Sequence, residues 1–246
     1  MRNSSRSSLR VSVFVLAAML LASASFAMVR EVSFEELTQL SETTMELVVV
    51  NSYAAWNAEH TAIFTHYVVE PIRQVGGGSR GNRFELLFAG GRTTDGKQMI
   101  VTEVPQLEVG GQYILFLHPR QARHASPTVG MWQGALRVVR DPATGGSAIV
   151  DAQGRLIEKD ADGKLVRGRS VDVDANGFMS PAVIVPEPGM ESEPVLKDPQ
   201  GRVIPMPRHA AVVSEAVPVR QPVDPDTLMN IVERLREHPP QPRRQQ

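Results

Sequence analysis

The stretch Gly110-Gly-Gln-Tyr-Ile-Leu-Phe-Leu-His118 decides the fold. Its two glycines are typical of a tight turn, and the apolar and aromatic run over 112–118 is typical of a β-strand. Four comparable runs precede it, and glycine-rich turn sequences separate several of them: 46–53, 62–71, 83–89 and 98–104. Five strands at hairpin spacing predict a small closed sheet.

The chain after this sheet predicts hairpins joined by tight turns. The runs 134–140 and 147–151 flank a turn sequence with two glycines, which indicates another hairpin. An Asp-x-x-Gly pattern then recurs at four places, and it favours a type I turn followed by a left-handed residue: 151–154, 160–163, 174–177 and 198–201. We therefore expect a β-hairpin meander over 151–185.

Two helices are expected at the ends of the chain. Ser33 stands three residues before Glu36, as in a capping box, and predicts a short helix over 32–40. Prolines become frequent after Val183, which predicts an extended tail over 186–246. One helix interrupts this tail at about 224–237, with Asp224 as its cap and an apolar face that can dock on the sheet or on a partner: Leu228, Ile231, Val232 and Leu235.

The first 27 residues have the pattern of a secretory signal peptide. Three arginines precede the apolar run 11–22, and small residues lead to a cleavage site after Ala27. That run is shorter than the roughly 20 residues that a membrane-spanning helix needs. We expect an exported protein, periplasmic or extracellular, that has no membrane span after cleavage.

Composition excludes several classes of function. The chain has 26 basic and 27 acidic residues, and this balance argues against nonspecific nucleic-acid binding. It contains no cysteine, which excludes thiol catalysis, zinc–thiolate sites and disulfides. The expected organisation is a signal peptide (1–27), a β-domain (28–150), the meander (151–185) and the proline-rich tail (186–246).

Two glycine-rich stretches imitate nucleotide or catalytic motifs. Residues 76–81 match the spacing of a dinucleotide loop and of a nucleophile elbow, and 91–97 nearly match a phosphate-binding loop. Each of these motifs requires a helix after the loop. A predicted strand follows in both places, so we interpret both stretches as hairpin turns.

One stretch matches half of a calcium-binding loop. Asp172, Asp174 and Asn176 stand at its first, third and fifth positions, and Gly177 at its sixth. The twelfth position is Val183, where the loop needs a bidentate carboxylate. The stretch predicts either a weak calcium site or an ordinary Asp-Gly turn, and no other cofactor is expected.

Aromatic residues are scarce, which draws attention to Trp56 and Trp132. In a small barrel a tryptophan usually fills the core, so we favour that position for both. An exposed platform for a ligand is the alternative.

The order of these features resembles a group of uncharacterised exported bacterial proteins with a small β-domain. It is carried by the strand 46–53, Trp56, Ile63-Phe-Thr65, Gly90-Gly91, Pro105 and the Tyr-x-Leu-Phe-Leu pattern of residues 113–117. The order is also similar, more distantly, to the netrin-type OB barrel. The resemblance covers about 45–150. It differs at Gln112, where the group commonly has Glu, and in the missing cysteines of netrin-type domains.

The resemblance implies an OB-like barrel over about 45–150. Together with the elements predicted above, the expected fold is a mainly β protein: a five-stranded OB-like barrel with an added hairpin meander, a short N-terminal helix and a proline-rich tail carrying one helix. OB-type barrels bind ligands on one sheet face and its neighbouring loops. Here that surface holds six candidate residues: Trp56, Arg73, Arg80, Arg83, Arg92 and Lys97. We expect an anionic polysaccharide or another exported protein as partner, and a solvated basic edge is the alternative.

The expected function is that of an exported, non-catalytic binding or structural β-domain. A calcium-stabilised cell-surface or adhesion module is one alternative. An exported hydrolase without a recognisable motif is the other, and it ranks lower because the sequence positions no nucleophile, base and orienting group together.

Overall fold

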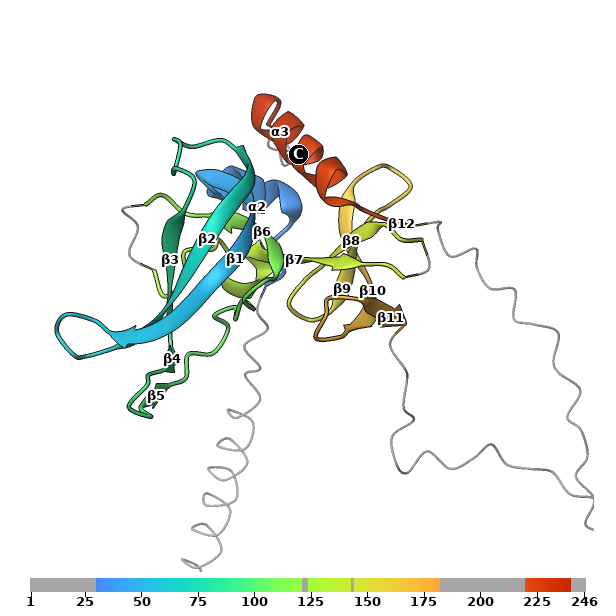
Figure 1. Ribbon diagram of the computed structural model, residues 1–246. Coiled ribbons are helices and arrows are strands. Elements are labelled where there is room, and N and C mark those ends of the chain that lie inside the picture. The colour runs from blue at the N-terminus through green and yellow to red at the C-terminus, as the bar shows by residue number, and fades with distance from the viewer. Residues whose placement is uncertain (1–29, 121–123, 143, 182–219, 240–246) are drawn as a thin grey trace, which may run out of the picture. The chain divides into compact units, whose positions relative to one another are not determined.

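The computed structural model describes residues 30–120, 124–142, 144–181 and 220–239 (Figure 1). The described residues from Val32 onward belong to one compact unit. The predicted signal peptide (1–27) and residues 186–219 of the predicted tail lie outside the described residues. Within the described part, no helix is long and apolar enough to cross a membrane.

Within the described residues, the protein is mainly β with two α-helices, as predicted. Its main sheet is antiparallel and has the order β11-β10-β9-β8-β7-β6-β1-β2-β3. These strands are β1 (Thr43–Trp56), β2 (Ile63–Val75), β3 (Phe84–Ala89), β6 (Gln112–Leu117), β7 (Ala135–Arg140), β8 (Ser147–Val150), β9 (Arg155–Lys159), β10 (Leu165–Val173) and β11 (Met179–Pro181). The short β12 (Gln221–Pro222) pairs with β9, and β4 (Gly91–Arg92) pairs with β5 (Gln98–Met99) in a separate hairpin.

The predicted closed five-stranded barrel is not confirmed. Among the described residues, no pairing joins the end strands β3 and β11, so the sheet is open. The predicted strand over 98–104 shortens to the two residues of β5. Strand β6 pairs with β1 on one side and with β7 on the other, and this leaves β6 no free edge for residues 98–104.

Strand β6 lies between two apolar clusters. Tyr113, Leu115 and Leu117 on one face join a cluster with β1, β2 and β3. Ile114 and Phe116 on the other face join a cluster with the two helices. Because both faces are buried, the strand reads as a continuous apolar run rather than an alternating one.

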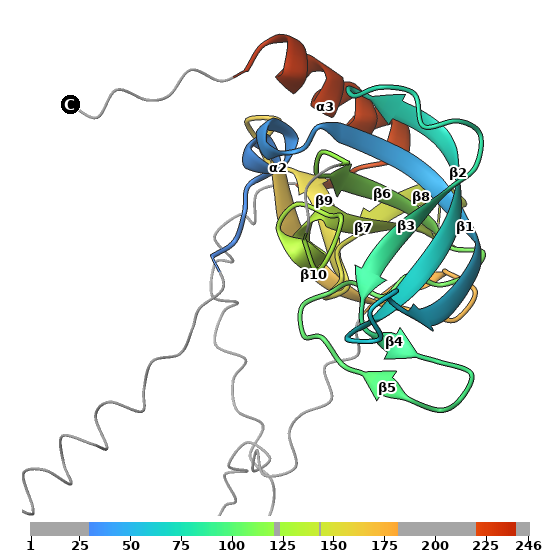
Figure 2. The same cartoon turned by 90° about the vertical axis from the view of Figure 1, so that its left-hand side faces the viewer.

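Both predicted helices are confirmed: they are α2 (Phe34–Leu40) and α3 (Pro225–Glu237). Ser33 and Glu36 form the capping box, and Asp224 Oδ1 accepts a hydrogen bond of 2.8 Å from the Thr227 amide. Helix α3 packs on α2, β1, β2 and β8 (Figures 1 and 2). Its apolar face is part of the main core, so it docks on its own chain.

Three of the four predicted Asp-Gly turns lie in the described residues, and all three have the same geometry. In each, the glycine adopts a left-handed φ of 72 to 79° and its amide donates to the aspartate carbonyl. Each aspartate Oδ1 also accepts from two backbone amides further along the turn. These turns connect β8–β11 into one sheet with β7, and Val150 pairs with Leu156 across the first of them.

Candidate functional site

Two hollows lie side by side along β7. The first has a volume of about 680 Å³ and lies between loop 103–108 and the segments 150–154 and 171–173. The second, of about 500 Å³, lies between residues 108–112 and the turn that ends at Phe178. Glu108 and Arg137 line both hollows. We call the two together the β7 groove.

Each hollow of the β7 groove holds an aromatic side chain, and the lining of the first hollow is mainly apolar, whereas that of the second is mainly polar. Trp132, on a 3₁₀ helix over Met131–Gly134, lines the first hollow, and Phe178, which is 40% exposed, lines the second. Apolar residues of the first hollow come from both sides of it: Val104, Pro105, Leu107, Tyr113, Val150 and Val171. A concave surface that combines apolar and aromatic side chains with polar groups is typical of a binding site.

Two non-glycine residues beside this groove have left-handed backbone. Glu103 has a φ of 68° and Met131 a φ of 58°. The surroundings hold both in place, since the Trp132 amide donates to the Glu103 carbonyl at 3.1 Å and Thr128 Oγ1 donates to the Met131 carbonyl at 2.8 Å. Strained backbone of this kind costs of the order of 1 kcal/mol per residue and gathers at functional sites.

Two tyrosines fix the loop that forms one wall of the groove. The Leu107 amide donates to Tyr67 Oη at 3.1 Å, and the Glu108 amide donates to Tyr113 Oη at 2.9 Å. Burial raises the pKa of both phenols, so each remains protonated. The wall is therefore preorganised rather than dependent on a ligand.

Three of the five charged side chains that line the first hollow, Glu108, Arg137 and Asp151, are in ion pairs. Arg137 is bound to Glu108, and the buried Asp151 is bound to Arg155 at 2.8 Å and lies 3.5 Å from Arg167. Within the described part of the chain, the carboxylates of Glu103 and Asp172 have no ion pair. The first hollow therefore holds two carboxylates without an ion pair, and Arg140 adds a positive charge to the second hollow.

The basic residues of the predicted surface form two groups, which lie near the two ends of strand β2. Arg73, Arg80 and Arg83 lie around the β2–β3 connection, where Arg83 pairs with Glu70 and Arg80 Nη2 lies 3.9 Å from Glu42. Arg73 donates to Asn230 at 2.7 Å and to Glu233 at 3.3 Å on α3.

The remaining two basic residues, Arg92 and Lys97, belong to the β4–β5 hairpin, which lies beside Thr65. From Thr65 to Arg73 the strand extends roughly 25 Å. The structure therefore does not bring the five basic residues together.

The prediction that both tryptophans fill the core is wrong for Trp56. Trp56 ends β1, is 36% exposed, and its ring centroid lies 6.1 Å from that of His60. It lies on the outside because β1 extends beyond the apolar clusters before its hairpin with β2. Trp132 is partly buried and lines the β7 groove, so the core prediction is not confirmed for this residue either.

The predicted calcium ligands lie at the β10–β11 turn. Asp174 Oδ1 accepts hydrogen bonds from the amides of Asn176 at 2.9 Å and Phe178 at 2.8 Å. This is the pattern of the sister turns at Asp151 and Asp160. Asp172 lines the first hollow and Asn176 the second, so the turn forms part of the groove.

Sequence reasoning missed a hydrogen-bonded cluster on the outer face of β1–β3. Tyr53 Oη donates to Glu85 Oε1 at 3.0 Å, and His66 Nδ1 lies 3.2 Å from Glu85 Oε2. The Tyr53 and His66 rings are stacked at 4.6 Å. The hydrogen bond from His66, followed by that from Tyr53, holds the pKa of Glu85 below its ordinary value. Only the strand register brings these three residues together.

No protein-family model, no curated protein and no solved structure matches this chain. The site is therefore interpreted from its own geometry.

Proposed function

We propose that this protein is an exported, non-catalytic binding module whose β7 groove holds an extended segment of another exported protein. The observation that carries the proposal is the meeting of two hollows at the Glu108–Arg137 pair, with Trp132 in one and Phe178 in the other. A groove of this form suits an extended chain better than a compact small molecule.

The charge and lining of the groove favour a polypeptide over an anionic polysaccharide. Glu103 and Asp172 would repel a polyanion, and they would attract a lysine or arginine side chain. The apolar lining offers contacts for aliphatic side chains, and Trp132 offers the kind of aromatic surface that dominates interface energies. Two of the basic residues expected to attract a polyanion, Arg73 and Arg83, are already paired with acidic side chains.

The resemblance to exported small β-domain proteins of OB-like form stays part of this proposal. The Tyr-x-Leu-Phe-Leu pattern that carries it forms most of β6, and the Tyr113 hydroxyl supports the groove wall. A motif of structural residues at this position is consistent with a scaffold whose function lies in the loops around it.

Peptide selection tests the proposal with a matched pair of variants. A displayed library of random peptides is selected against the full chain, and affinities of the selected peptides are measured by calorimetry. Trp132→Ala should weaken binding by about tenfold or more, because it removes an aromatic contact surface. Trp56→Ala removes the other tryptophan, which lies outside the groove, and should leave the affinity unchanged.

The location of the bound peptide provides a second readout. On ¹⁵N-labelled protein, the selected peptide should perturb the amide resonances of Trp132 and 171–173, and should leave those of Tyr53 and His66 unchanged. Equal losses in the two tryptophan variants, or perturbations confined to the outer face of β1–β3, would contradict the assignment to the β7 groove.

A further inference from the structure

We propose that a small oxyanion, such as sulfate, phosphate or a carboxylate, binds where the glycine-rich loop 76–81 meets the start of β1 and the end of α3. Three buried donor atoms in this region have no hydrogen-bond partner: Arg80 Nη2, Arg236 Nε and Thr43 Oγ1. The site is separate from the β7 groove and does not depend on the function proposed for it.

Arg80 is the central residue of this site. Its side chain is only 8% exposed, and its guanidinium lies 5.7 Å from the ring centroid of Phe84. The nearest carboxylate, Glu42, is 3.9 Å away, which is too far for a hydrogen bond. A buried guanidinium nitrogen without an acceptor is costly, and an oxyanion would supply the acceptor.

Arg236 and Thr43 approach the same loop from two other elements. A Cβ at Gly76 would lie 2.8 Å from Arg236 Nη1 and 2.8 Å from the Glu42 carbonyl, and a Cβ at Gly77 would collide with Thr43 Oγ1. Both glycines also have a left-handed φ, of 74° and 64°. The absence of side chains at these two positions lets the loop pack against both donor groups.

The charges around the loop are predominantly positive. Arg120 lies close enough to Arg80 to lower its pKa further, after the larger effect of burial, and donates to the Ser79 carbonyl at 3.4 Å. Burial also lowers the pKa of Arg236. Against these three arginines stands Glu42, whose side chain is partly exposed. A bound anion would offset the repulsion between Arg80 and Arg120.

The anion would also bind two distant parts of the chain together. Arg236 on α3 already donates to the Ser41 carbonyl at 3.1 Å and to Ser41 Oγ at 2.9 Å. Contacts from one anion to Arg80 and Arg236 would add a link between the β2–β3 loop and the C-terminal helix. Anion binding is therefore expected to stabilise the docking of α3.

Calorimetric titration of the full chain with inorganic sulfate and inorganic phosphate, in chloride buffer at constant ionic strength, tests the site. We expect one bound anion per chain. Arg80→Gln should weaken binding by about tenfold or more, and Thr43→Val, which preserves the shape of the side chain, by about fivefold, the loss of one hydrogen bond. Arg83→Gln is the matched control, because Arg83 lies on the same connection but is exposed and paired with Glu70; its affinity should equal that of the parent.

Several outcomes would overturn the proposal. Sulfate stabilises folded proteins in general, so an equal rise of the melting temperature in the parent and in Arg80→Gln would show a solvent effect and no site. If neither sulfate nor phosphate gives any heat of binding, the proposal is also overturned. If Arg80→Gln does not fold, Thr43→Val decides the question by itself. A parallel titration with acetate distinguishes a carboxylate from the tetrahedral anions, and binding of a heparin disaccharide alone would overturn the assignment to a small ion.

Discussion

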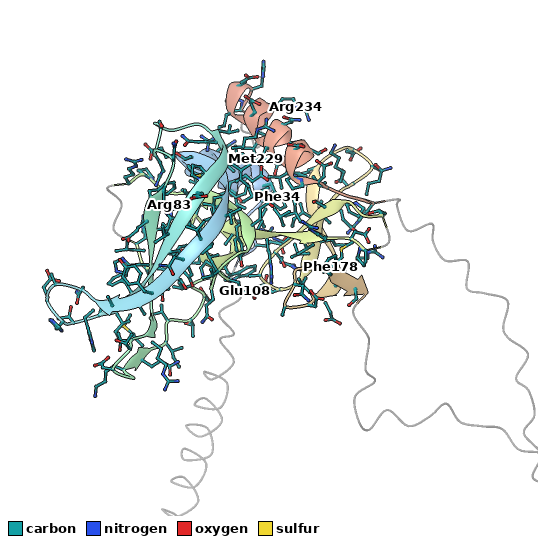
Figure 3. The ribbon with its side chains drawn as sticks, in the orientation of Figure 1. Phe34, Arg83, Glu108, Phe178, Met229 and Arg234 are labelled. Carbon is teal, nitrogen blue, oxygen red and sulfur yellow. The ribbon has the colours of Figure 1, made fainter. Side chains whose placement is uncertain are left out.

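The guanidinium of Arg137 holds the carboxylate of Glu108 through two hydrogen bonds, of 3.2 and 2.7 Å. Arg137 belongs to β7 and Glu108 to the loop before β6, so the pair connects the two sides of the β7 groove. Glu108 and Phe178 both lie at the lower side of the sheet in Figure 3. The pair is partly exposed, with side-chain exposures of 19% and 57%.

Because it is partly exposed, this ion pair should matter more for binding than for stability. Glu108→Gln should change the free energy of unfolding by less than about 1 kcal/mol in urea denaturation. The same variant should weaken the binding of a groove-selected peptide severalfold, because Arg137 is no longer held in one orientation. Glu70→Gln breaks the pair with Arg83 outside the groove and should not affect peptide affinity. A large loss of stability in Glu108→Gln would contradict this division of roles.

The Asp-Gly turns allow a matched comparison of a buried and a partly exposed aspartate. Asp151 and Asp160 accept the same pair of backbone hydrogen bonds, but only Asp151 is buried and faces two arginines. Asp151→Asn should lower the free energy of unfolding by about 3–5 kcal/mol, because Arg167 and Arg155 lose their carboxylate. Asp160→Asn should cost about 1 kcal/mol or less. Equal effects in urea denaturation would show that the turn, rather than the ion pairs, governs stability at Asp151.

The C-terminal helix should be essential to the main core. Leu228 is fully buried on α3, and Met229 and Phe34 belong to the same apolar cluster (Figure 3). Leu228→Ala should therefore lower the free energy of unfolding by about 2–5 kcal/mol, measured in urea. Arg234→Ala, on the exposed side of the same helix, should change it by about 0.5 kcal/mol at most. A small effect of Leu228→Ala would indicate that α3 detaches before the sheet unfolds.

His118 should make stability depend on pH in the mildly acidic range. Burial, and next the neighbouring His124, lower the pKa of His118 below its ordinary value of 6.5. The unfolded chain therefore binds this proton more tightly than the folded one, and the free energy of unfolding falls as the pH drops below 6.5. The urea concentration at the unfolding midpoint should therefore be lower at about pH 5.5 than at about pH 7.5.

A pair of histidine variants identifies the group responsible. His118→Gln should remove this part of the pH dependence, whereas His238→Gln, at the exposed end of α3, should preserve it. Glu85 acts in a different range: its lowered pKa contributes stability above its ordinary pKa of 4.5, and this stability is lost at lower pH. An unchanged midpoint in the parent across the mildly acidic range would contradict the assignment to His118.

Sequence patterns were sufficient wherever structure depends on near neighbours. The caps at Ser33 and Asp224 and the turns at Asp151, Asp160 and Asp174 all involve hydrogen bonds within four residues along the chain. The apolar face of α3 was also correctly predicted, because helix periodicity depends only on local spacing. The strand runs were identified for the same reason, apart from 98–104.

The candidate sites depended on pairing between distant segments. Trp132 and Glu103 are 29 residues apart in the sequence, and the proposed anion site draws on a hairpin loop, the start of β1 and α3. A local sequence pattern cannot predict contacts between segments that are so far apart along the chain. The six predicted ligand residues were grouped because they are basic or aromatic and lie near one another in the sequence. In the structure they form two groups, because strand β2 is long and the groups lie near its opposite ends.

By itself, the sequence determined that this chain is mainly β, where most of its strands and its two described helices lie, and how its turns are closed. Those features follow from backbone preferences and from side chains that bond within a few residues. Only the tertiary structure decided that β6 pairs with both β1 and β7, that the sheet remains open, and that Glu108 meets Arg137. Strand order and register are set by the summed burial of both faces of each strand, a property of the whole fold that no single segment contains.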